Sequence, residues 1–293
     1  MTYEHVLVAG GQGKLGSALG RLGANALGRD TLDVLSIENI DTTFTHHQPK
    51  LVVNCTAYTN VDDAETDRNK VFALNRDGAR YLAGACARQA IPLLHISTDC
   101  VFGDGDPSQP VSEIAPTKPL SVYGQSKLAG EKEVRAAGGP HCIARVSWLF
   151  DHSPQSFIGK MLALAQTRDA LRIVDDAYGR PTEVNSLALQ LLTLSEHMLA
   201  GNAVPPLLHL GPPDPVNRFG WAKAIFSASA EFGGPCPALT HCSSDEFQDV
   251  ARRPRGLILD TQLADSLLGP QPDWQVSSDK AVAAILSKEA DAS

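Results

Sequence analysis

Short apolar runs rich in β-branched residues alternate along the first half of the chain with longer segments of helical period. Because strands that alternate with helices usually lie in one parallel sheet, this order predicts an α/β fold, a doubly wound parallel sheet with helices on both faces. Every crossover between strands is expected to be right-handed. The predicted strands are 5–10, 51–55, 91–97 and 141–146, and the predicted helices are 14–22, 71–90 and 121–137.

The alternation ends after Trp148, where many prolines divide the chain into short pieces. Helical periodicity remains at 157–166 and 187–200, so the second half is predicted to be a smaller α+β part. Substrate is expected to bind in the cleft between the two parts. The predicted division assigns 1–150 and roughly 178–204 to the sheet domain, and 151–177 and 205–293 to a C-terminal substrate domain.

Composition and charge exclude several classes of protein. A content of 43% hydrophobic and 20% charged residues is that of a folded globular enzyme, not of a disordered or fibrous chain. The formal charge is −8 and no segment concentrates basic residues, so nucleic acid is not an expected partner. Apolar runs stay far below the roughly 18 residues that span a bilayer, and no signal peptide precedes the first strand. The chain is expected to work in the cytoplasm, without a membrane partner.

The six cysteines are scattered and lack the paired spacing of a zinc site. Cys55, Cys86 and Cys142 lie in apolar segments, where a thiol usually behaves as a small hydrophobic side chain. The pair His46 and His47 precedes a polar loop, where solvated side chains are favoured over a ligand set. No metal site is expected.

Three glycines follow the first predicted strand and begin the first predicted helix. Gly10, Gly13 and Gly16 give the spacing G-x-x-G-x-x-G. Such glycines permit a sharp turn and a close approach of the backbone to a pyrophosphate, whose charge the amino end of the helix stabilises. A tight turn without a ligand is the alternative, but the order of strand, turn and helix favours a dinucleotide site in a Rossmann-type domain. The spacing points to short-chain reductases rather than to most classical dehydrogenases.

Charged residues some twenty positions after Gly10, near the end of the strand expected to follow the first helix, bear on the choice of cofactor. An acid at this place would bind a ribose 2′-hydroxyl, whereas an arginine would pair with a 2′-phosphate. Arg29 and Asp30 are both present, and Asp33 and Val34 follow, placed to bracket the adenine. Arg29 favours NADPH, and NADH stays open. The alternative is that Arg29 and Asp30 are solvated charges of a turn.

Thr98, Tyr123 and Lys127 form the constellation that decides the chemistry. Tyr123 and Lys127 are four residues apart on a predicted helix, so their side chains share one face. The ammonium is expected to lower the pKa of the Tyr123 phenol and make it a usable proton donor. Thr98 ends a predicted strand and can hydrogen-bond a substrate carbonyl. A pair of surface residues on a helix is the alternative, which the order of Thr98 and the glycines disfavours.

With these motifs the chain resembles the extended short-chain dehydrogenase/reductase family and, within it, the dTDP-4-dehydrorhamnose reductases. The resemblance extends over most of the chain, and the segment N-x-x-A-Y-T-x-V-D-x-A-E is far more specific to this branch than the glycines are. The matching blocks are GGQGKLG (10–16), LDV (32–34), NCTAYTNVDDAE (54–65), STDCVF (97–102), PLSVYGQSKLAGE (119–131), RVSWLF (145–150), DDAYGRPT (175–182) and ARRP (251–254).

The resemblance implies which residues touch the cofactor. Tyr123 and Lys127 would contact it and also form the catalytic set with Thr98. The sheet domain would then be an NADP-binding domain. The residues implied at the diphosphate, the adenosine, and the ribose and nicotinamide are, in that order, Gly13, Lys14 and Leu15, then Asp33 and Val34, then Ala57, Tyr58 and Thr59.

The resemblance also implies a nucleotide-sugar pocket. Asp99 and Trp148 would line it together with Thr98 and Tyr123, and Val61 would lie at its edge. A flat indole face packs well against a hexose ring while its N–H still donates a hydrogen bond. A tryptophan in the core between the two parts is the alternative for Trp148.

Several positions depart from the pattern of the family. Cys100 stands where relatives usually carry a tyrosine, Ala177 where they carry a glutamine, and Leu257 where they carry a serine. Some relatives dimerise through a magnesium ion held by glutamates, but the matching places here are Ala18 and Asn185. These departures argue against a metal, and a homodimer stays open.

The resemblance implies NADPH-dependent reduction of the C4 ketone of a dTDP-4-dehydro-6-deoxyhexose, with dTDP-4-dehydro-L-rhamnose as the expected substrate. A reductase or 4-epimerase for another nucleotide-4-ketosugar is one alternative. A catalytically silent, NADP-binding regulatory subunit is another, which the intact set of Thr98, Tyr123 and Lys127 disfavours. A 4,6-dehydratase is disfavoured because Asp99 and Cys100 stand where that elimination needs an acid–base pair.

Overall fold

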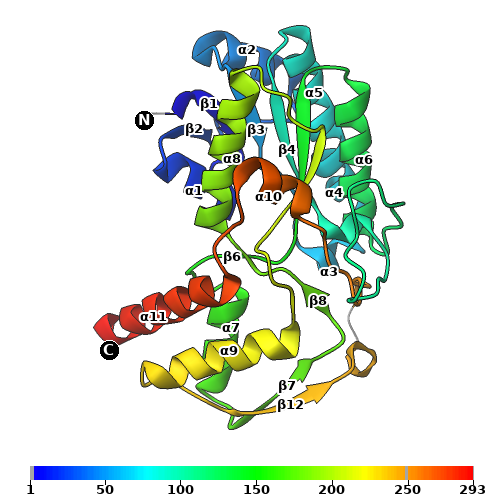
Figure 1. The fold of residues 1–293 in the computed structure, drawn as a ribbon. Coiled ribbons are helices and arrows are strands. Elements are labelled where there is room, and N and C mark those ends of the chain that lie inside the picture. The colour runs from blue at the N-terminus through cyan, green and yellow to red at the C-terminus, as the bar shows by residue number, and fades with distance from the viewer. Residues whose placement is uncertain (1–2, 248–249, 293) are drawn as a thin grey trace.

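One parallel sheet organises the larger part of the molecule in the computed structural model, which describes residues 3–247 and 250–292 (Figure 1). Its six strands have the order β10-β5-β4-β3-β1-β2, and all neighbours are parallel. The order reverses at β1, which opens a crevice at the carboxyl ends of β1 and β3. The strands are β1 (Tyr3–Ala9), β2 (Ala24–Leu27), β3 (Leu51–Asn54), β4 (Leu93–Thr98), β5 (His141–Val146) and β10 (Leu207–Leu210).

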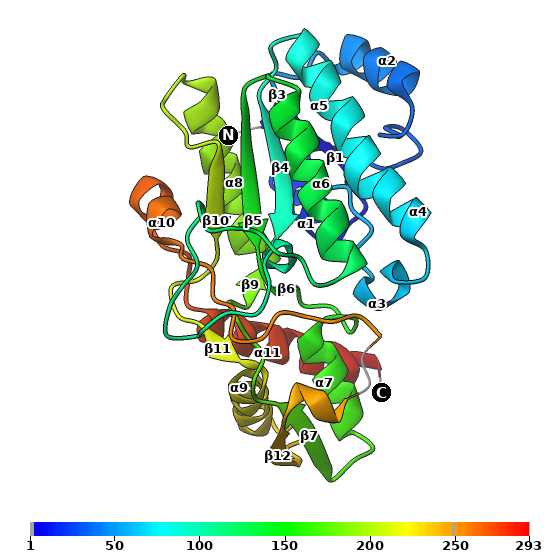
Figure 2. The same ribbon diagram turned by 90° about the vertical axis from the view of Figure 1, so that its right-hand side faces the viewer.

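Helices cover both faces of this sheet (Figure 2). α1 and α8 share a core with Val6 and Val8 of β1, whereas α2, α5 and α6 share a core with Leu7 and Ala9. Successive strand residues point to opposite faces, and here both sets are buried, as a doubly covered sheet requires. The predicted fold class is confirmed. The helices are α1 (Lys14–Arg21), α2 (Ile37–His47), α5 (Ala79–Arg88), α6 (Val122–Ala136) and α8 (Val184–Leu199).

The helix predicted at 71–90 is interrupted by a π-helical turn. Asn75 lies in that turn with 1% of its surface exposed. Its side chain accepts a hydrogen bond from the backbone N–H of Tyr58 at 2.7 Å and donates to the Ser126 hydroxyl at 2.9 Å. A π turn shifts the helical register, which apolar periodicity does not show. The three pieces are α4 (Arg68–Phe72), the π turn (Ala73–Gly78) and α5.

The smaller part lies below the sheet and has its own core, centred on Trp221 and Phe226. The prediction of short pieces after residue 205 was wrong for α9 and α11, because alanines and serines dilute the apolar stripe on which periodicity depends. Three two-stranded ladders complete this part. Its elements are β6 (Leu149–Phe150), α7 (Phe157–Ala165), β7 (Ala170–Val174), β8 (Tyr178–Gly179), β9 (Thr182–Glu183), β11 (Val216–Asn217), α9 (Arg218–Glu231), β12 (Ala238–Cys242) and α11 (Trp274–Ala292).

Two elements predicted to lie in the smaller part belong to the sheet domain instead. The sequence assigned 205–293 to the substrate domain, but β10 pairs with β5 at the edge of the main sheet. Leu208 and Leu210 of β10, and Ala264 of α10 (Gln262–Leu268), are buried in the core beside α8. The boundary moves because apolar β10 residues gain more burial on the sheet than in the smaller part.

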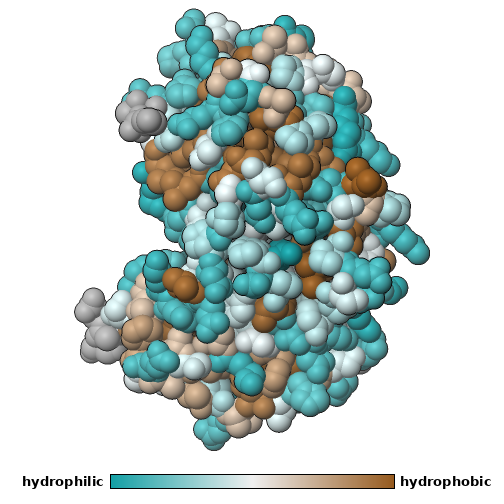
Figure 3. Space-filling view, viewed as in Figure 1, coloured by the Kyte–Doolittle hydropathy of each residue, from teal (hydrophilic) through white to brown (hydrophobic). Residues whose placement is uncertain are grey.

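The outer face of α1 and α8 combines apolar and polar side chains (Figure 3). Leu189 of α8 is 56% exposed.

The positions that match the magnesium ligands of some relatives are Ala18 and Asn185. Asn185 accepts a hydrogen bond from Arg21 at 2.9 Å, and Ala18 is buried. Among residues 3–247 and 250–292, no set of three or more histidine, cysteine, aspartate or glutamate side chains is arranged to hold a metal ion. No helix in these ranges is both long and apolar enough to cross a membrane.

Candidate active site

A cavity of about 700 Å³ opens at the carboxyl ends of the central strands, against β6 and β8 of the smaller part. It brings together residues that are far apart in sequence, from the glycine turn after β1 to the 251–257 segment. Of the predicted site residues, those that line it are Gly13, Lys14, Leu15, Gly16, Ala57, Thr59, Val61, Thr98, Asp99, Tyr123, Lys127 and Trp148.

The glycine turn shapes one end of the cavity. Gly10 has φ +85°, a left-handed conformation that glycine adopts without strain. A Cβ on Gly16 would lie 2.2 Å from the Gly10 carbonyl oxygen, so α1 can pack this closely only with glycine at that position. Gly13 caps α1 without a side chain, which leaves the first N–H groups of the helix directed at the cavity. Lys14, the first residue of α1, forms an ion pair with Asp151 at 3.1 Å.

Four predicted cofactor residues besides Gly10 do not line this cavity. Arg29 is 76% exposed at its side chain and lies 4.0 Å from the Asp33 carboxylate. Asp33 also accepts a hydrogen bond from the backbone N–H of Leu35 at 3.0 Å. Val34 is 2% exposed and belongs to the core under the sheet. Tyr58 is held at its backbone by the Asn75 side chain, a contact that spacing along the sequence did not indicate.

Thr98 and Tyr123 come from two neighbouring elements and meet in the cavity. Thr98 ends β4, and its hydroxyl donates to Asp99 Oδ1 at 2.9 Å. Tyr123 lies in the first turn of α6. Ser121 caps this helix, and its side chain accepts a hydrogen bond from the backbone N–H of Gly124 at 3.1 Å. A Cβ on Gly124 would lie 2.1 Å from the Cys100 carbonyl oxygen, so this glycine lets α6 approach the end of β4.

The acidity of Tyr123 differs from the expectation. Burial raises the pKa of the phenol, the nearby Cys100 and Asp99 raise it further, and only the hydrogen bond with Thr98 lowers it. The prediction that Lys127 lowers this pKa was wrong, because burial has the largest effect on it and Lys127 is not among the groups that shift it. Tyr123 is therefore a protonated donor at neutral pH.

Lys127 is buried directly beneath the cavity, with 2% of its surface exposed. Its ammonium donates a hydrogen bond of 2.7 Å to the backbone carbonyl of Ile96. Burial lowers the pKa of Lys127 to about 8, and Glu131 and Cys55 oppose the change. The lysine thus carries a charge at neutral pH that it loses in mild alkali.

Asp99 and Cys100 follow Thr98 in a single 3₁₀ turn (Asp99–Val101). Both line the cavity, so position 100 faces the predicted sugar pocket. Burial raises the pKa of Asp99, while hydrogen bonds with Thr98 and Cys100 and the charge of Arg218 oppose the rise. Leu257 packs with Val101 in a small apolar cluster and also lines the cavity.

Arg218 is a cavity residue that sequence reasoning missed. It begins α9, and its guanidinium carbon lies 3.6 Å from the centroid of the Trp148 ring. Trp148 itself has φ +49°, an uncommon conformation for a residue with a side chain. Burial lowers the pKa of Arg218 to about 9, and Asp99 opposes the change. No motif precedes Arg218 in the sequence, so only the fold places it here.

A second cavity of about 530 Å³ adjoins the first and shares Arg218, Arg253 and Ala177 with it. Five of its lining residues are arginines, since Arg172, Arg252 and Arg255 lie there as well. Arg252 and Arg253 come from the ARRP block, for which the sequence predicted no role. The concentration of guanidinium groups suits an anionic ligand that reaches from one cavity into the other.

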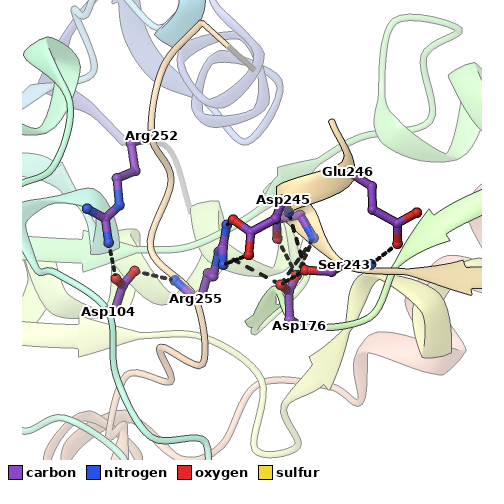
Figure 4. A network of polar contacts seen from close by, with 8 residues as sticks. Asp104, Asp176, Ser243, Asp245, Glu246, Arg252 and Arg255 are labelled. Carbon is purple, nitrogen blue, oxygen red and sulfur yellow. Dashed lines mark hydrogen bonds and ion pairs between the residues drawn. The ribbon is translucent and has the colours of Figure 1, made fainter. Parts of the chain in front are cut away.

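Ion pairs fix the 251–257 segment over these cavities. Arg253 binds Asp62 of α3 (Val61–Ala64) through both carboxylate oxygens, at 3.1 and 2.7 Å. Figure 4 shows the other side, where Arg252 and the backbone of Arg255 converge on Asp104. The Arg255 side chain also binds Asp245 and lies 3.8 Å from Asp176. The segment is thereby tied to both parts of the molecule.

The donor set of the first cavity fits a nicotinamide dinucleotide. The N–H groups at the start of α1 suit a diphosphate, and Gly13 and Gly16, which line the cavity, add no side chain to the space beside them. Lys127 offers a buried ammonium next to that space, and Tyr123 a protonated phenol beside Thr98. The arrangement can bind a carbonyl compound and deliver a proton to its oxygen.

Comparison with known proteins agrees with this chemistry. A family model described as the RmlD substrate binding domain matches residues 4–287. The chain belongs to this family. It is similar to the dTDP-4-dehydrorhamnose reductase of Sinorhizobium fredii (strain NBRC 101917 / NGR234), with 35% identity over 269 residues that cover 91% of this chain and 90% of the relative. It is also similar to the dTDP-4-keto-6-deoxy-D-glucose reductase of Streptomyces niveus, with 37% identity over 202 residues that cover 67% of this chain and 70% of the relative.

The fold of this RmlD family member is that of solved dTDP-4-dehydrorhamnose reductases. The structure of the enzyme from Bacillus anthracis str. Ames in complex with NADP superimposes with a TM-score of 0.84, at 28% identity, and covers 94% of this chain and 97% of that chain. The likeness therefore includes the smaller part as well as the sheet domain.

Proposed function

We propose that this protein reduces the C4 ketone of dTDP-4-dehydro-L-rhamnose to dTDP-L-rhamnose with NADPH. The observation that carries the proposal is the meeting of Thr98, Tyr123 and Lys127 in one cavity with the glycine turn of α1. The similarity to the dTDP-4-dehydrorhamnose reductase of Sinorhizobium fredii and the NADP in the related Bacillus anthracis structure support it. Both reactants are soluble phosphorylated compounds, and we place the reaction in the cytoplasm.

Each of the three residues Thr98, Tyr123 and Lys127 has its own role in the proposed reaction. When bound, the cofactor supplies the hydride that converts the ketone carbon into a carbinol. Thr98 donates a hydrogen bond to the ketone oxygen and orients it, and Tyr123 gives that oxygen its proton. The raised pKa of Tyr123 keeps the phenol protonated until negative charge develops on the oxygen beside it. Lys127 binds the sugar hydroxyls of the cofactor and stabilises the phenolate that remains after the transfer.

Two separate places on the chain would bind the phosphates of the cofactor. The amino end of α1, with Gly13, Lys14 and Leu15, holds the diphosphate. Ala57 and Thr59, which line the same cavity, would contact the ribose and nicotinamide of the bound cofactor. Arg29 would hold the 2′-phosphate of NADPH. Its side chain is 76% exposed and would have to break only the 4.0 Å ion pair with Asp33, which contributes little at the surface.

The arginine-lined second cavity holds the nucleotide diphosphate of the substrate. Arg218 belongs to both cavities, so its guanidinium can bind the diphosphate while the hexose extends toward Thr98. Asp99 and Val61 contact the hexose from the other side. Trp148 contacts it with the ring edge, because Arg218 and Trp221 pack against the indole.

A panel of nucleotide-4-ketosugars tests the proposal. The purified protein is incubated with dTDP-4-dehydro-L-rhamnose or dTDP-4-keto-6-deoxy-D-glucose, and loss of absorbance of NADPH and of NADH is followed. We expect net oxidation of NADPH with the first compound and dTDP-L-rhamnose as the product by NMR. Absence of cofactor oxidation with every member of the panel would contradict the proposal.

A second candidate is a reductase for a differently configured 4-ketosugar. The relative from Streptomyces niveus carries the name of a dTDP-4-keto-6-deoxy-D-glucose reductase. Cys100 supports this candidate, since a thiol in the lining leaves more room beside Thr98 than a tyrosine would. The panel separates the two, because the better substrate shows the higher kcat/KM. A 4-epimerase would interconvert the sugars without net consumption of cofactor.

A further inference from the structure

One face of the main sheet carries polar side chains where a doubly covered sheet normally has an apolar core. Asn54, His95, Ser97, Arg145 and His209 come from four neighbouring strands, and each is at most 2% exposed. The register places Ser97 beside Arg145, and Arg145 beside His209. Buried polar groups are costly unless they are bonded, so such a row calls for a purpose other than packing.

Glu131 of α6 is the centre of this polar row. It has no exposed surface, and it accepts hydrogen bonds from Ser97 at 2.7 Å and from two nitrogens of Arg145 at 2.8 Å each. Arg135 reaches the same carboxylate from the surface at 3.0 Å. Burial favours the neutral acid, but the bonds from Arg145, Ser97 and Arg135 outweigh it and hold the pKa of Glu131 below its usual value. Glu131 is therefore a buried carboxylate that stays ionised.

Glu131 and Lys127 are coupled through both the helix and the strand. They are one turn apart on α6, where residues i and i+4 lie on the same face. Lys127 is bonded to the carbonyl of Ile96, and Glu131 to the hydroxyl of the next residue, Ser97. Two consecutive residues of β4 thus anchor two consecutive turns of α6. A displacement of Glu131 would move the lysine with it.

The other titratable groups around Lys127 are neutral. Burial lowers the pKa of His95 well below its usual value, with the charge of Lys127 acting in the same direction. Burial raises the pKa of Cys55 to about 12, and it raises that of Tyr123 as well. Glu131 is therefore the ionised acid that these contacts place beside the lysine. The positive charges of Arg145 and Arg135 partly offset its negative charge.

We propose that Glu131 is a positioning residue for Lys127: clamped by Ser97 and Arg145, it fixes the helix turn that carries the lysine and supplies the negative charge that keeps it an ammonium. The inference rests on the proposed function only for its effect on turnover. The polar row across the sheet then serves to hold one carboxylate in place below the active site.

Substitution of Glu131 by glutamine tests the proposal. Glu131→Gln keeps the size of the side chain and an oxygen for Ser97 and Arg145, but it removes the charge. The Lys127 ammonium is titrated by NMR in protein labelled with ¹⁵N-lysine, and its signal is assigned by its loss in Lys127→Met. We expect the pKa of Lys127 to fall by about one pH unit, because an adjacent carboxylate shifts a pKa by that order. The alkaline limb of kcat/KM is expected to move down by the same amount.

The controls separate charge from structure. Glu133→Gln makes the same change two residues further along α6, outside the polar row, and should leave the Lys127 titration unchanged. If Glu131→Gln does not fold, Arg135→Ala replaces it: loss of this surface cation should raise the pKa of Lys127. An unchanged Lys127 titration in the folded Glu131→Gln variant, or in Arg135→Ala where it replaces that variant, overturns the proposal, and so does an equal shift in Glu133→Gln. Because the titration needs no substrate, this result stands apart from the outcome of the ketosugar panel.

Discussion

The guanidinium carbon of Arg218 lies over the indole ring of Trp148, 3.6 Å from its centroid. The same indole is stacked with Trp221 at 5.8 Å and 15°. Gly179 is needed beside this ring, since a Cβ there would lie 2.5 Å from an indole carbon. Trp148 thus packs against a half-buried cation at the junction of the two cavities.

Loss of the Arg218 cation should weaken binding of the nucleotide sugar. Arg218→Met keeps an apolar side chain over Trp148 but removes the charge-assisted hydrogen bonds to a diphosphate, each of which contributes about 1.5–3 kcal/mol. We expect the KM for the nucleotide sugar to rise by roughly 10-fold or more, with the KM for NADPH nearly unchanged. The exposed Arg168→Met is the matched control. Equal effects on both KM values in initial-rate measurements would place Arg218 outside the substrate site.

Tyr123→Phe removes the proposed proton donor. Turnover should fall by about 10²-fold or more, which is the scale of a lost general acid, while the affinity for NADPH changes little. Tyr81→Phe, on α5, should retain normal turnover. Single-turnover rates and cofactor titration by fluorescence measure the two effects. Near-normal turnover in Tyr123→Phe would remove this residue from the mechanism.

The protonation of Lys127 should set the alkaline limit of activity. Its pKa of about 8, lowered by burial, predicts that kcat/KM falls as the pH rises through 8. Stability should respond in the opposite sense. Between pH 8 and 10.5 the unfolded chain binds more protons at this lysine, so its destabilising contribution disappears as the pH rises through that range. Denaturant melts of Lys127→Met and of the exposed control Lys132→Met, compared with the original protein at each pH, measure this contribution.

Arg29→Ala tests the preference for NADPH. Its guanidinium can grip a 2′-phosphate through two parallel hydrogen bonds, which NADH cannot accept. The KM for NADPH should rise, while the KM for NADH, as the internal control, stays nearly constant. An equal change in both constants would show that Arg29 does not reach the 2′ position, and its ion pair with Asp33 would then be its role.

Gly16→Ala should disrupt the glycine turn. Its Cβ would lie 2.2 Å from the Gly10 carbonyl oxygen, so α1 would have to move away from β1. A strained position of this kind costs about 1–3 kcal/mol or more, and NADPH affinity should fall with the displaced helix end. Gly84→Ala on α5 meets no atom closer than 3.8 Å and should be neutral or slightly stabilising. Thermal melts and cofactor titration of the two variants check the contrast.

The sequence by itself determined the sheet, the glycine turn and the reacting groups. Strand and helix periods are local, and burial on both sides makes β3 a nearly continuous apolar run. The spacing of Tyr123 and Lys127 fixes their shared helix face in the same local way. Thr98 joins them because β4 ends where α6 begins to pack.

The tertiary structure alone decided what surrounds those groups. Arg218 and Asn75 carry no local pattern that marks them, and their contacts join segments that the chain brings together only on folding. The pKa of Tyr123 depends on burial, which a one-turn spacing to Lys127 cannot supply. The placement of β10 depends on which surface buries its leucines best, a comparison that exists only once the sheet has formed. Local periodicity determines elements, whereas enclosure and long-range charge determine the chemistry of the site.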